Sequence, residues 1–372
     1  MATLHGATST ELFMRSEPRR ETVVPATSPR LLGYRMPAEW EHHESTWISW
    51  PHNEETWPDE LEVVERTVAQ AVKALSRAEG IRINVNSRDH EARARRALDE
   101  VDVTGPVHFH RIPTNDAWVR DYGPIFVHSE DLGVAAVCWD FNSWGDKYPP
   151  YDLDNAAAGR MAEDLGVPAF EADMILEGGS IDVNGDGLLM TTESCLLNPN
   201  RNPDLDREEI VRRLRDFLGI EQVIWLSEGI VGDDTDGHID DIARFVGQNR
   251  IVTTTESDPA SENYDILQNN LEVLKGLRLS DGSALEVLEL PMPAPRQVKG
   301  LTMPASYANF YVGNGTVLVP TFDDDKDTDA IAVLKRAFPG RKIVGLYCGD
   351  LIWGLGAFHC LTQQVPASSN SR

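Results

Sequence analysis

Few cysteines, a shortage of basic residues and the absence of any long apolar run set the first limits on this 372-residue chain. The four cysteines show neither CxxC nor metal-ligand spacing and are too sparse for a disulfide-rich scaffold, so we expect reduced thiols. No stretch approaches the ~18 apolar residues of a membrane span, and the N-terminus lacks the apolar core of a signal peptide. We therefore expect a cytoplasmic protein that has no membrane partner.

Basic residues are scarce beside acidic ones: 34 Lys and Arg against 60 Asp and Glu give a net charge of -26. Proteins that bind nucleic acid neutralise phosphates with Lys and Arg, so this balance argues against nucleic acid as a partner. A small cationic substrate suits the acidic field, although the charge also fits a role in solubility. GxSxG, a phosphate-binding glycine loop and GxGxxG are all absent, so we expect neither a serine hydrolase nor a nucleotide cofactor.

Helix-like segments followed by strand-like segments recur five times between two irregular ends. Residues 1–33 lack periodicity and predict a flexible extension, and 367–372 predict a short tail. The repetition within 34–366 is typical of one repeated supersecondary unit in an α/β fold rather than two unlike domains. The helix–strand pairs are 59–80 with 81–85, 154–166 with 170–179, 206–219 with 222–226, 262–276 with 285–290, and 327–340 with 342–347.

A polar or glycine-rich segment follows each of these units. If the units surround a pseudo-fivefold axis, the segments converge at its centre, and loops on a rigid scaffold are where chemistry is commonly placed. The segments are "NDAWVRDYGP", "EGGS", "DDTDGHIDD", "SYANFYVGNG" and "GLGAFHC".

The segment "TDGHIDD" contains Asp236, His238 and Asp240, which share one face if the chain is extended. A D-x-H-x-D run of this kind can hold a divalent metal. It can equally present a general base beside a carboxylate that binds a cation. A polar turn before the strand-like "IARFV" remains open as well, because Asp and Gly dominate turns.

Two further segments carry side chains suited to a planar cation. In "DAWVRDYGP", Trp118 can flank such a cation and Asp121 can bind it, unless Arg120 and Asp121 simply pair with each other. In "LEGGS", Glu177 ends an apolar run, where an acid needs a partner or a ligand. The thiol of Cys360 in "GLGAFHC" is a nucleophile once ionised, although a buried strand is the ordinary reading of such a stretch.

One motif matches a calcium-binding loop without the flanks that such a loop requires. Residues 182–193 satisfy D-x-[DN]-x-[DN]-G-x5-E, but "GSIDV" and "LLMTT" on either side are strand-like. We expect a β-hairpin here rather than a calcium site. The acidic run 323–329 likewise predicts a loop that leads into a helix N-terminus.

Several long motifs in order resemble the agmatine deiminase family, which also includes bacterial peptidylarginine deiminases. The resemblance covers about residues 34 to 366, and these motifs carry it: "MPAEWE", "TWISWP", "NDAWVRDYGP", "LEGGSIDVNGDGLLMTTESCLLNPNRNP", "DTDGHIDDIARFV", "SYANFYVGNG" and "HCLTQQ". It implies the pentein fold, a five-bladed α/β propeller with a central active site. It also implies metal-free, cofactor-free hydrolysis of a guanidinium, which for agmatine yields the polyamine precursor N-carbamoylputrescine.

The resemblance also implies roles for individual residues. Cys360 corresponds to the nucleophile and His238 to the acid/base, and Glu177 to the carboxylate beside that histidine. Asp121 and Asp240 correspond to the carboxylates that bind the guanidinium. The resemblance places three channel residues at Trp118, Tyr307 and Asn309.

Departures from the family pattern concern the substrate's tail. Leu355 interrupts the usual run of three glycines, and Ala357 and Phe358 replace a polar and an aliphatic residue, so another guanidino compound or peptidyl arginine stays open as substrate. We expect Asp233 or Asp234 to meet the distal amine of agmatine, and His359 to orient or pack rather than to transfer a proton.

Two readings outside this chemistry also stay open. One is a metal-dependent hydrolase that uses the D-x-H-x-D run, and the other is a non-catalytic binding protein of the same fold. The resemblance also points to a homo-oligomer.

Overall fold

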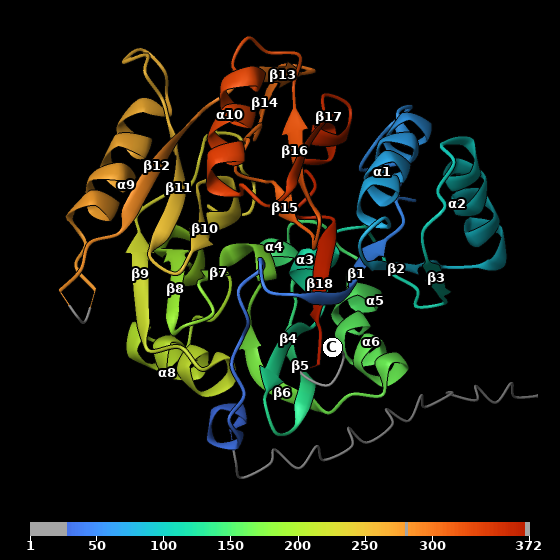
Figure 1. Ribbon diagram of the computed structural model, residues 1–372, viewed down its shortest axis with the longest axis horizontal. Helices are drawn as coiled ribbons and strands as arrows, with labels where there is room; N and C mark the ends of the chain where they lie inside the picture. The colour runs from blue at the N-terminus through green and yellow to red at the C-terminus, as the bar shows by residue number, and fades with distance from the viewer. Residues whose placement is uncertain (1–27, 280–281, 369–372) are drawn as a thin grey trace, which may run out of the picture.

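The computed structural model describes residues 28–279 and 282–368, and it has a mixed α/β fold (Figure 1). Small sheets follow one another around the molecule, from the blue one at the right, through green and yellow ones below and at the left, to the orange one at the top. The loops at the inner ends of these strands carry the candidate site.

Five sheets in the described residues share one pattern of strand pairing. The first strand of each set pairs antiparallel with the second, and the second pairs parallel with the third. The sets are β18 (Thr362–Pro366), β1 (His43–Ser49) and β2 (Gly80–Asn84); β4 (Ile125–Ser129), β5 (Gly133–Asp140) and β6 (Ala169–Ile175); β7 (Asp182–Val183), β8 (Leu188–Thr192) and β9 (Gln222–Leu226); β10 (Ala243–Gly247), β11 (Arg250–Thr255) and β12 (Glu286–Pro291); and β15 (Tyr311–Val312), β16 (Thr316–Thr321) and β17 (Lys342–Tyr347).

The connection between the two parallel strands of each set contains a helix of nine residues or more, because strands that run in the same direction need a crossover between them. The five predicted helix–strand pairs are therefore confirmed. The connecting helices are α1 (Leu61–Leu75), α6 (Ala157–Leu165), α8 (Arg207–Leu218), α9 (Tyr264–Gly276) and α10 (Asp327–Ala337).

Local signals explain where these helices begin and end. At the start of α8, the Asp206 side chain accepts a hydrogen bond of 2.9 Å from the Glu209 backbone N–H. At its end, Gly219 adopts a left-handed conformation with φ of 73°. Gly166 ends α6 in the same way. These caps stand where the sequence pattern predicts them.

The sequence pattern did not identify the first parallel strand of most sets (β1, β5, β11 and β16), and in the first sheet it also missed one helix and one further strand. Helix α2 (Arg88–Glu100) buries His90, Ala94 and Leu98, of which Leu98 alone is large and apolar, so its apolar pattern is weak. Strand β3 (Val107–His110) then adds to β2. The shorter elements are α3 (Val119–Tyr122), α4 (Ser143–Asp146), α5 (Asp152–Asn155), α7 (Glu193–Leu196), a hairpin of β13 (Arg296–Val298) and β14 (Leu301–Met303), and the 3-10 helices η1 (Pro29–Leu32), η2 (Gly178–Ser180), η3 (Ile239–Asp241) and η4 (Leu351–Gly354).

The two ends of the described chain are packed onto the fold. Of the predicted extension 1–33, residues 1–27 lie outside the described residues. The remainder forms η1, where Pro29 is buried. At the other end, β18 pairs with β1, and the Ala367 backbone N–H donates to the His42 carbonyl over 2.8 Å. The segment that contains Cys360 is thus anchored against the first strand of the fold.

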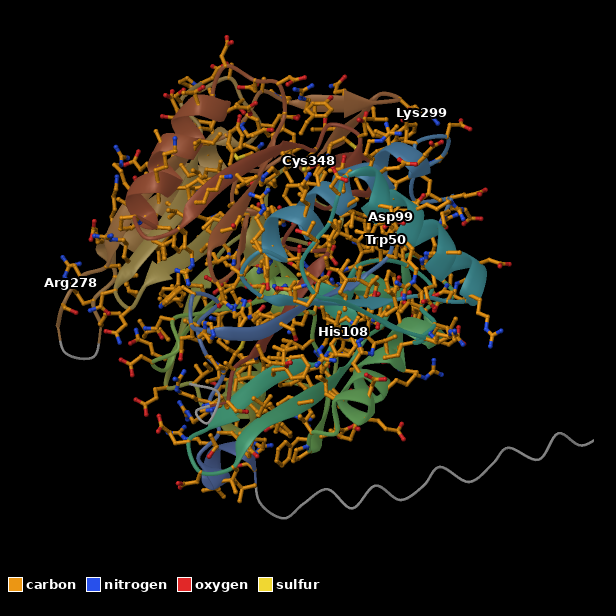
Figure 2. All side chains as sticks on the ribbon, turned by 45° about the vertical axis from the view of Figure 1, so that its right-hand side comes forward. Trp50, Asp99, His108, Arg278, Lys299 and Cys348 are labelled. Atoms are coloured by element: carbon orange, nitrogen blue, oxygen red, sulfur yellow. The ribbon has the colours of Figure 1, made fainter. Side chains whose placement is uncertain are left out.

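Side chains fill the space between the sheets and helices (Figure 2). The buried Trp50 and Cys348 lie inside the outline of the molecule in that view, whereas the exposed Arg278 and Lys299 lie at its edge. None of the helices within residues 28–279 and 282–368 combines the length and apolar character that a membrane crossing needs.

The calcium-like motif forms the expected hairpin of β7 and β8. The Asn184 side chain accepts from the backbone N–H groups of Asp186 and Leu188 and so shapes its turn. Asp182 is bound by Arg244 and by the Phe245 N–H. These oxygens therefore serve the turn and the neighbouring sheet.

Candidate active site

The loop before Cys360 passes closely over two indole rings. A Cβ added at Gly354 would lie 2.7 Å from Trp57, and one at Gly356 would lie 2.6 Å from Trp118. The two indoles pack on each other with centroids 5.3 Å apart. The glycines therefore make room for these rings. Leu355 between them has a φ of 69°, a left-handed conformation in which glycine is the usual residue.

Asn309 holds the Cys360 thiol. The Asn309 Nδ2 donates to Cys360 Sγ over 3.1 Å, and its Oδ1 accepts from the His359 N–H over 3.1 Å. Burial raises the pKa of the Cys360 thiol well above its usual value, and the nearby carboxylates, Asp240 first, raise it further. The sulfur is therefore a neutral thiol until a positive charge arrives beside it.

His238 is positioned by a tight turn and faces a carboxylate. The Asp233 carboxylate accepts from the His238 backbone N–H over 2.9 Å. The His238 Nδ1 lies 3.8 Å from Asp121 Oδ1. Burial lowers the pKa of His238, but Asp121, Cys195 and Asp240 together outweigh burial and hold the pKa well above its usual value. The imidazole is therefore set to start as an acid.

The expectation that Asp236 and His238 share one face of an extended segment is wrong. Asp236 and Gly237 both have left-handed backbone, with φ of 68° and 107°, so the chain turns between the two side chains. The Asp236 carboxylate binds Arg201, Asn200 and Lys147 instead. These described contacts leave the D-x-H-x-D run without a shared metal-binding face.

Two carboxylates and the imidazole surround the backbone of Gly179. A Cβ built there would lie 2.6 Å from His238 Nδ1, 2.7 Å from Asp121 Oδ1 and 3.0 Å from Asp240 Oδ2. The Cys360 Sγ lies 3.7 Å from the same Asp240 oxygen. Any side chain at position 179 would collide with these groups, so the glycine lets its backbone lie directly against the imidazole and the two carboxylates.

The Asp121 carboxylate is oriented from two sides. Its Oδ1 accepts from the Gly179 N–H over 2.9 Å, and its Oδ2 accepts from the Trp144 indole N–H over 3.0 Å. Burial raises the pKa of Asp121 to about 6, and the carboxylates of Asp240 and Glu177 add to the rise. A bound cation would reverse that shift.

Glu177 lies on the other side of His238, but its hydrogen-bonding partner is Arg201. The Arg201 Nε lies 2.5 Å from Glu177 Oε1, and both side chains are fully buried. Glu177 Oε2 and His238 Nε2 have no hydrogen-bond partner. Within the described residues these two groups and the Cys195 thiol approach within 4.8 Å of one another, the one set that could hold a metal. The raised pKa of His238 disfavours the neutral ring that a metal requires.

The predicted channel residues divide between the pocket and the core. Trp118 and Asp234 line the pocket, and Asn309 holds the thiol from behind. Asp234 accepts from the Tyr148 hydroxyl over 2.5 Å and pairs with Lys147. Tyr307 lies outside the lining residues and is fully buried, with its hydroxyl donating to Asp327 over 2.7 Å.

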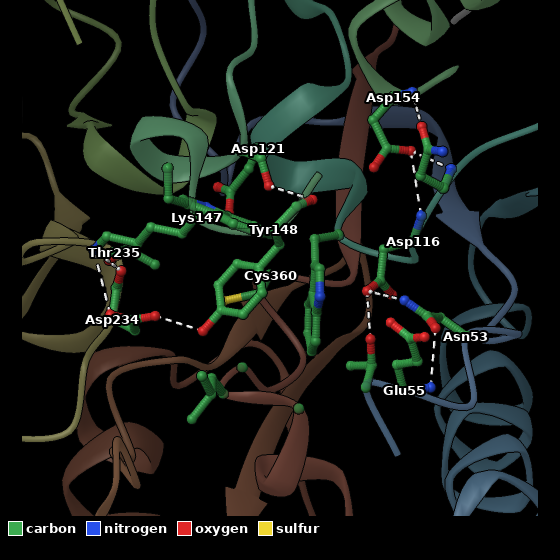
Figure 3. A pocket seen from close by; sticks show the side chains of 18 of the residues that line it. Asn53, Glu55, Asp116, Asp121, Lys147, Tyr148, Asp154, Asp234, Thr235 and Cys360 are labelled. Atoms are coloured by element: carbon green, nitrogen blue, oxygen red, sulfur yellow. Dashed lines mark hydrogen bonds and ion pairs between the residues drawn. The ribbon is translucent and has the colours of Figure 1, made fainter. Parts of the chain in front are cut away.

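The pocket has a volume of about 640 Å³ and is predominantly acidic. Figure 3 shows Asp121, Tyr148 and Asp234 on one side, Asn53 and Asp116 on the other, and the Cys360 sulfur between them. Among the described residues that line it, Lys147 is the only lysine or arginine. Its carboxylates belong to Glu54, Glu55, Asp116, Asp121, Asp154 and Asp234.

Sequence reasoning missed three residues that hold this site together. They are Glu39, which binds His359, Arg201, which binds Glu177, and Trp144, which binds Asp121. Glu39 and Arg201 stand inside the motifs "MPAEWE" and "NPNRNP", and that position was the available signal. Nothing in the sequence around Trp144 marked it.

Comparisons with known proteins agree with this geometry. Residues 35–366 match the family model described as Porphyromonas-type peptidyl-arginine deiminase. An agmatine deiminase of Pseudomonas aeruginosa (strain LESB58) is 38% identical, with 92% of this chain and 98% of the relative covered.

Two solved structures share the fold and the length. The agmatine deiminase of Enterococcus faecalis has a TM-score of 0.86 at 33% identity, covering 92% of this chain and 98% of that one. A putative arginine deiminase from Porphyromonas gingivalis has a TM-score of 0.81 at 34% identity, covering 90% and 98%. Since the family model spans nearly all of the described residues, the chain belongs to the Porphyromonas-type peptidyl-arginine deiminase family.

Proposed function

We propose that this protein is an agmatine deiminase, a hydrolase that converts the guanidinium of agmatine to N-carbamoylputrescine and ammonia. The observation that carries the proposal is the cluster of one imidazole, His238, and two carboxylates, Asp121 and Asp240, around the backbone of Gly179, with the Cys360 sulfur 3.7 Å from Asp240. The relatives named agmatine deiminase, at 38% and 33% identity over 92% of the chain, support the choice of substrate.

The first step of the proposed mechanism is capture of the guanidinium. The group is a flat cation with N–H donors on its edges, and carboxylates bind such donors in pairs. Asp121 and Asp240 are the two carboxylates that lie directly against Gly179. Asp240 Oδ1 is buried without a hydrogen-bond partner, so it has an oxygen free for this purpose.

Binding also activates the nucleophile. The carboxylates around Cys360 raise the pKa of its thiol, and a guanidinium bound among them supplies the opposing charge. The thiol then releases its proton to solvent, which leaves a thiolate beside the central carbon of the substrate, and a solvent proton returns to the sulfur when the product is released. Orientation by two carboxylates compensates for the poor electrophilicity of that carbon.

The bond changes follow from these positions. The Cys360 sulfur bonds to the guanidinium carbon, and a tetrahedral adduct forms. His238 gives a proton to one amino group, the C–N bond breaks and ammonia leaves, so a thiouronium stays on the enzyme. His238 then takes a proton from water, the resulting hydroxide bonds to the carbon, and the C–S bond breaks. The products are a ureido compound, ammonia and the restored cysteine.

The pocket lining supports agmatine over free arginine. Arginine carries a carboxylate at the end opposite its guanidinium, and Lys147, the one lysine or arginine in the lining, is already paired with Asp234 and Asp236. Agmatine carries an ammonium at that end instead, which suits an acidic lining. Asp234 remains our proposed contact for this ammonium, because it is the carboxylate of the predicted pair that reaches the pocket.

The test is ammonia release by the purified protein with agmatine, arginine or an arginyl peptide, each with and without a chelator. We expect turnover of agmatine alone, unaffected by chelator and abolished in Cys360→Ala. Turnover of the peptide instead would replace the substrate and keep the chemistry. Loss of activity with chelator would overturn the metal-free mechanism, and no turnover of any of the three would overturn the deiminase proposal.

We also propose a fold, a cellular setting and an assembly state for this protein. We propose that the five similar sheets are the blades of a pentein propeller and that 34–366 form one catalytic domain, which the repeated strand pattern supports. We propose a reducing cytoplasmic setting, because the nucleophile must stay a thiol and all four cysteines are free. We also propose a homo-oligomer that binds no nucleic acid, the latter supported by the charge of -26.

A further inference from the structure

His359, next to the nucleophile in the chain, lies between two buried carboxylates. Its Nδ1 is 2.6 Å from Asp240 Oδ2, and its Nε2 is 2.7 Å from Glu39 Oε2. The three side chains are at most 6% exposed. An ionised carboxylate oxygen can only accept a hydrogen bond, so each ring nitrogen must carry a hydrogen if both carboxylates are charged.

The environment of Glu39 keeps its charge. Its carboxylate accepts from Arg244 Nη2 over 2.8 Å and from the Val312 N–H over 2.8 Å, and Arg120 Nη2 lies 3.5 Å away. Burial raises the pKa of Glu39, but Arg244 and His359 outweigh it and hold the pKa well below its usual value. The proton between the two groups therefore belongs to the histidine.

Asp240 has a lowered pKa for the same reason: burial raises it, and the hydrogen bond and charge of His359 outweigh the burial. The result is an asymmetric carboxylate. Its Oδ2 is fixed by His359, while its Oδ1 is buried with no hydrogen-bond partner. An oxygen held open in this way is suited to a ligand donor.

The anchor of His359 extends into the core. Arg244 joins Glu39 to Asp182, and its Nη1 donates to the Phe310 carbonyl over 2.7 Å. The charged groups that face the imidazole of His359 are Asp240, Glu39, Arg244, Arg120 and Asp182. Rigid partners on one side of the ring can thus fix the orientation of the carboxylate on the other side.

We propose that His359 is a doubly protonated imidazolium that positions Asp240 for the guanidinium and is itself anchored by Glu39. The inference rests on the proposed function for the identity of the ligand. His359 acts through Asp240 and moves no proton in the reaction, so it is a positioning residue rather than a catalytic one.

The first test needs no substrate. Protein labelled with nitrogen-15 in histidine is studied by NMR in the buffer of the binding experiments, and the His359 signal among the ten histidines is assigned by its loss in His359→Gln. We expect both ring nitrogens of His359 to carry a hydrogen, because each faces a carboxylate oxygen. A neutral ring overturns the proposal, and this holds whether or not agmatine is the substrate.

The second test measures agmatine affinity by calorimetry in a Cys360→Ala background, where turnover is blocked. Adding His359→Gln removes the charge and one of the two hydrogen bonds, so we expect affinity to fall by about tenfold or more. The matched control is His43→Gln, because His43 is also buried, lies 3.6 Å from Glu79 and bonds to the backbone carbonyl of Glu39 over 2.7 Å, without contacting Asp240 or the Glu39 carboxylate. That control should lower the melting temperature without changing the affinity.

The outcomes separate the two proposals. If Cys360→Ala alone fails to bind agmatine, the proposed function fails, and the NMR result still decides the state of His359. If it binds agmatine and His359→Gln binds equally well, His359 has only a structural role and the positioning proposal is wrong. Equal losses in His359→Gln and His43→Gln would also contradict it, because a general loss of packing would explain both.

Discussion

Replacing Gly179 by alanine should abolish activity while the protein still folds. The added Cβ would lie 2.6 Å from His238 Nδ1, 2.7 Å from Asp121 Oδ1 and 3.0 Å from Asp240 Oδ2. Contacts this short force all three groups to move. These are the groups proposed to bind the guanidinium and to transfer the proton, so binding and proton transfer would be impaired together.

The magnitude follows from the geometry of these contacts. A displacement of about 1 Å at a reacting group can cost about 100-fold in rate. Here three groups shift at once, each by a fraction of that distance. We therefore expect kcat/KM for agmatine to fall by about 1,000-fold, equivalent to about 4 kcal/mol of transition-state stabilisation.

The assay is steady-state ammonia release, with the melting temperature measured on the same samples. Gly159→Ala is the matched control: Gly159 lies in α6, and a Cβ there meets nothing within 4 Å. That control should keep full activity and gain about 0.5–1 kcal/mol in stability, because alanine favours a helix interior. Activity of Gly179→Ala within tenfold of the unmodified protein would refute the reasoning that the groups around Gly179 bind and process the substrate.

Three other predictions concern binding, specificity and stability. Agmatine affinity of the Cys360→Ala protein should fall as the pH drops below about 6, because Asp121 has a pKa of about 6 and its neutral form cannot pair with a cation; calorimetry from pH 5 to 8 checks this. Leu355→Gly should raise the ratio of kcat/KM for an arginyl peptide to that for agmatine by about tenfold, since Leu355 lines the pocket. Arg201→Gln should lower the free energy of unfolding by about 3–5 kcal/mol, because it leaves a buried carboxylate unpaired. The exposed Arg207→Gln should change it by less than ~1 kcal/mol, and equal urea midpoints for the two variants would contradict this.

The repeated helices and strands could be predicted because each carries its own local signal. Helix α8 has an acid at its N-cap, apolar residues on one face and Gly219 at its end. Helix α2 has Leu98 as its one large apolar residue, so its pattern was too weak to find. The pairing of β1 with β18 joins the two ends of the described chain, and no local pattern encodes such a contact.

The candidate site was only partly accessible from the sequence. Motif resemblance selected Asp121, Asp240 and His238, and the structure brings them together around Gly179. The face expected for Asp236 failed because the backbone at Asp236 and Gly237 is left-handed, which alternation rules for strands do not anticipate. Sequence proximity alone therefore could not separate a side chain of the site from one that supports the loop.

Partners at long sequence separation were the least predictable part of the site. Glu39 and His359 are 320 positions apart, and their contact exists only because the first and last segments of the fold lie together. Trp144 reaches Asp121 from a loop whose backbone is left-handed at Ser143, Trp144 and Asp146. Conformations of this kind depend on tertiary support rather than on local preference.

The negative charge around Cys360 affects both the binding of the substrate and the reactivity of the thiol. Burial is the main cause of the raised pKa of this thiol, and the carboxylates beside it oppose its ionisation further. The same carboxylates attract the guanidinium, and the arriving cation removes the opposition. Reactivity is thus coupled to occupancy of the site, and the empty site keeps its cysteine in the neutral, less oxidisable form. A more basic pocket would ionise the thiol sooner, but it would repel the cation that the thiol is meant to attack.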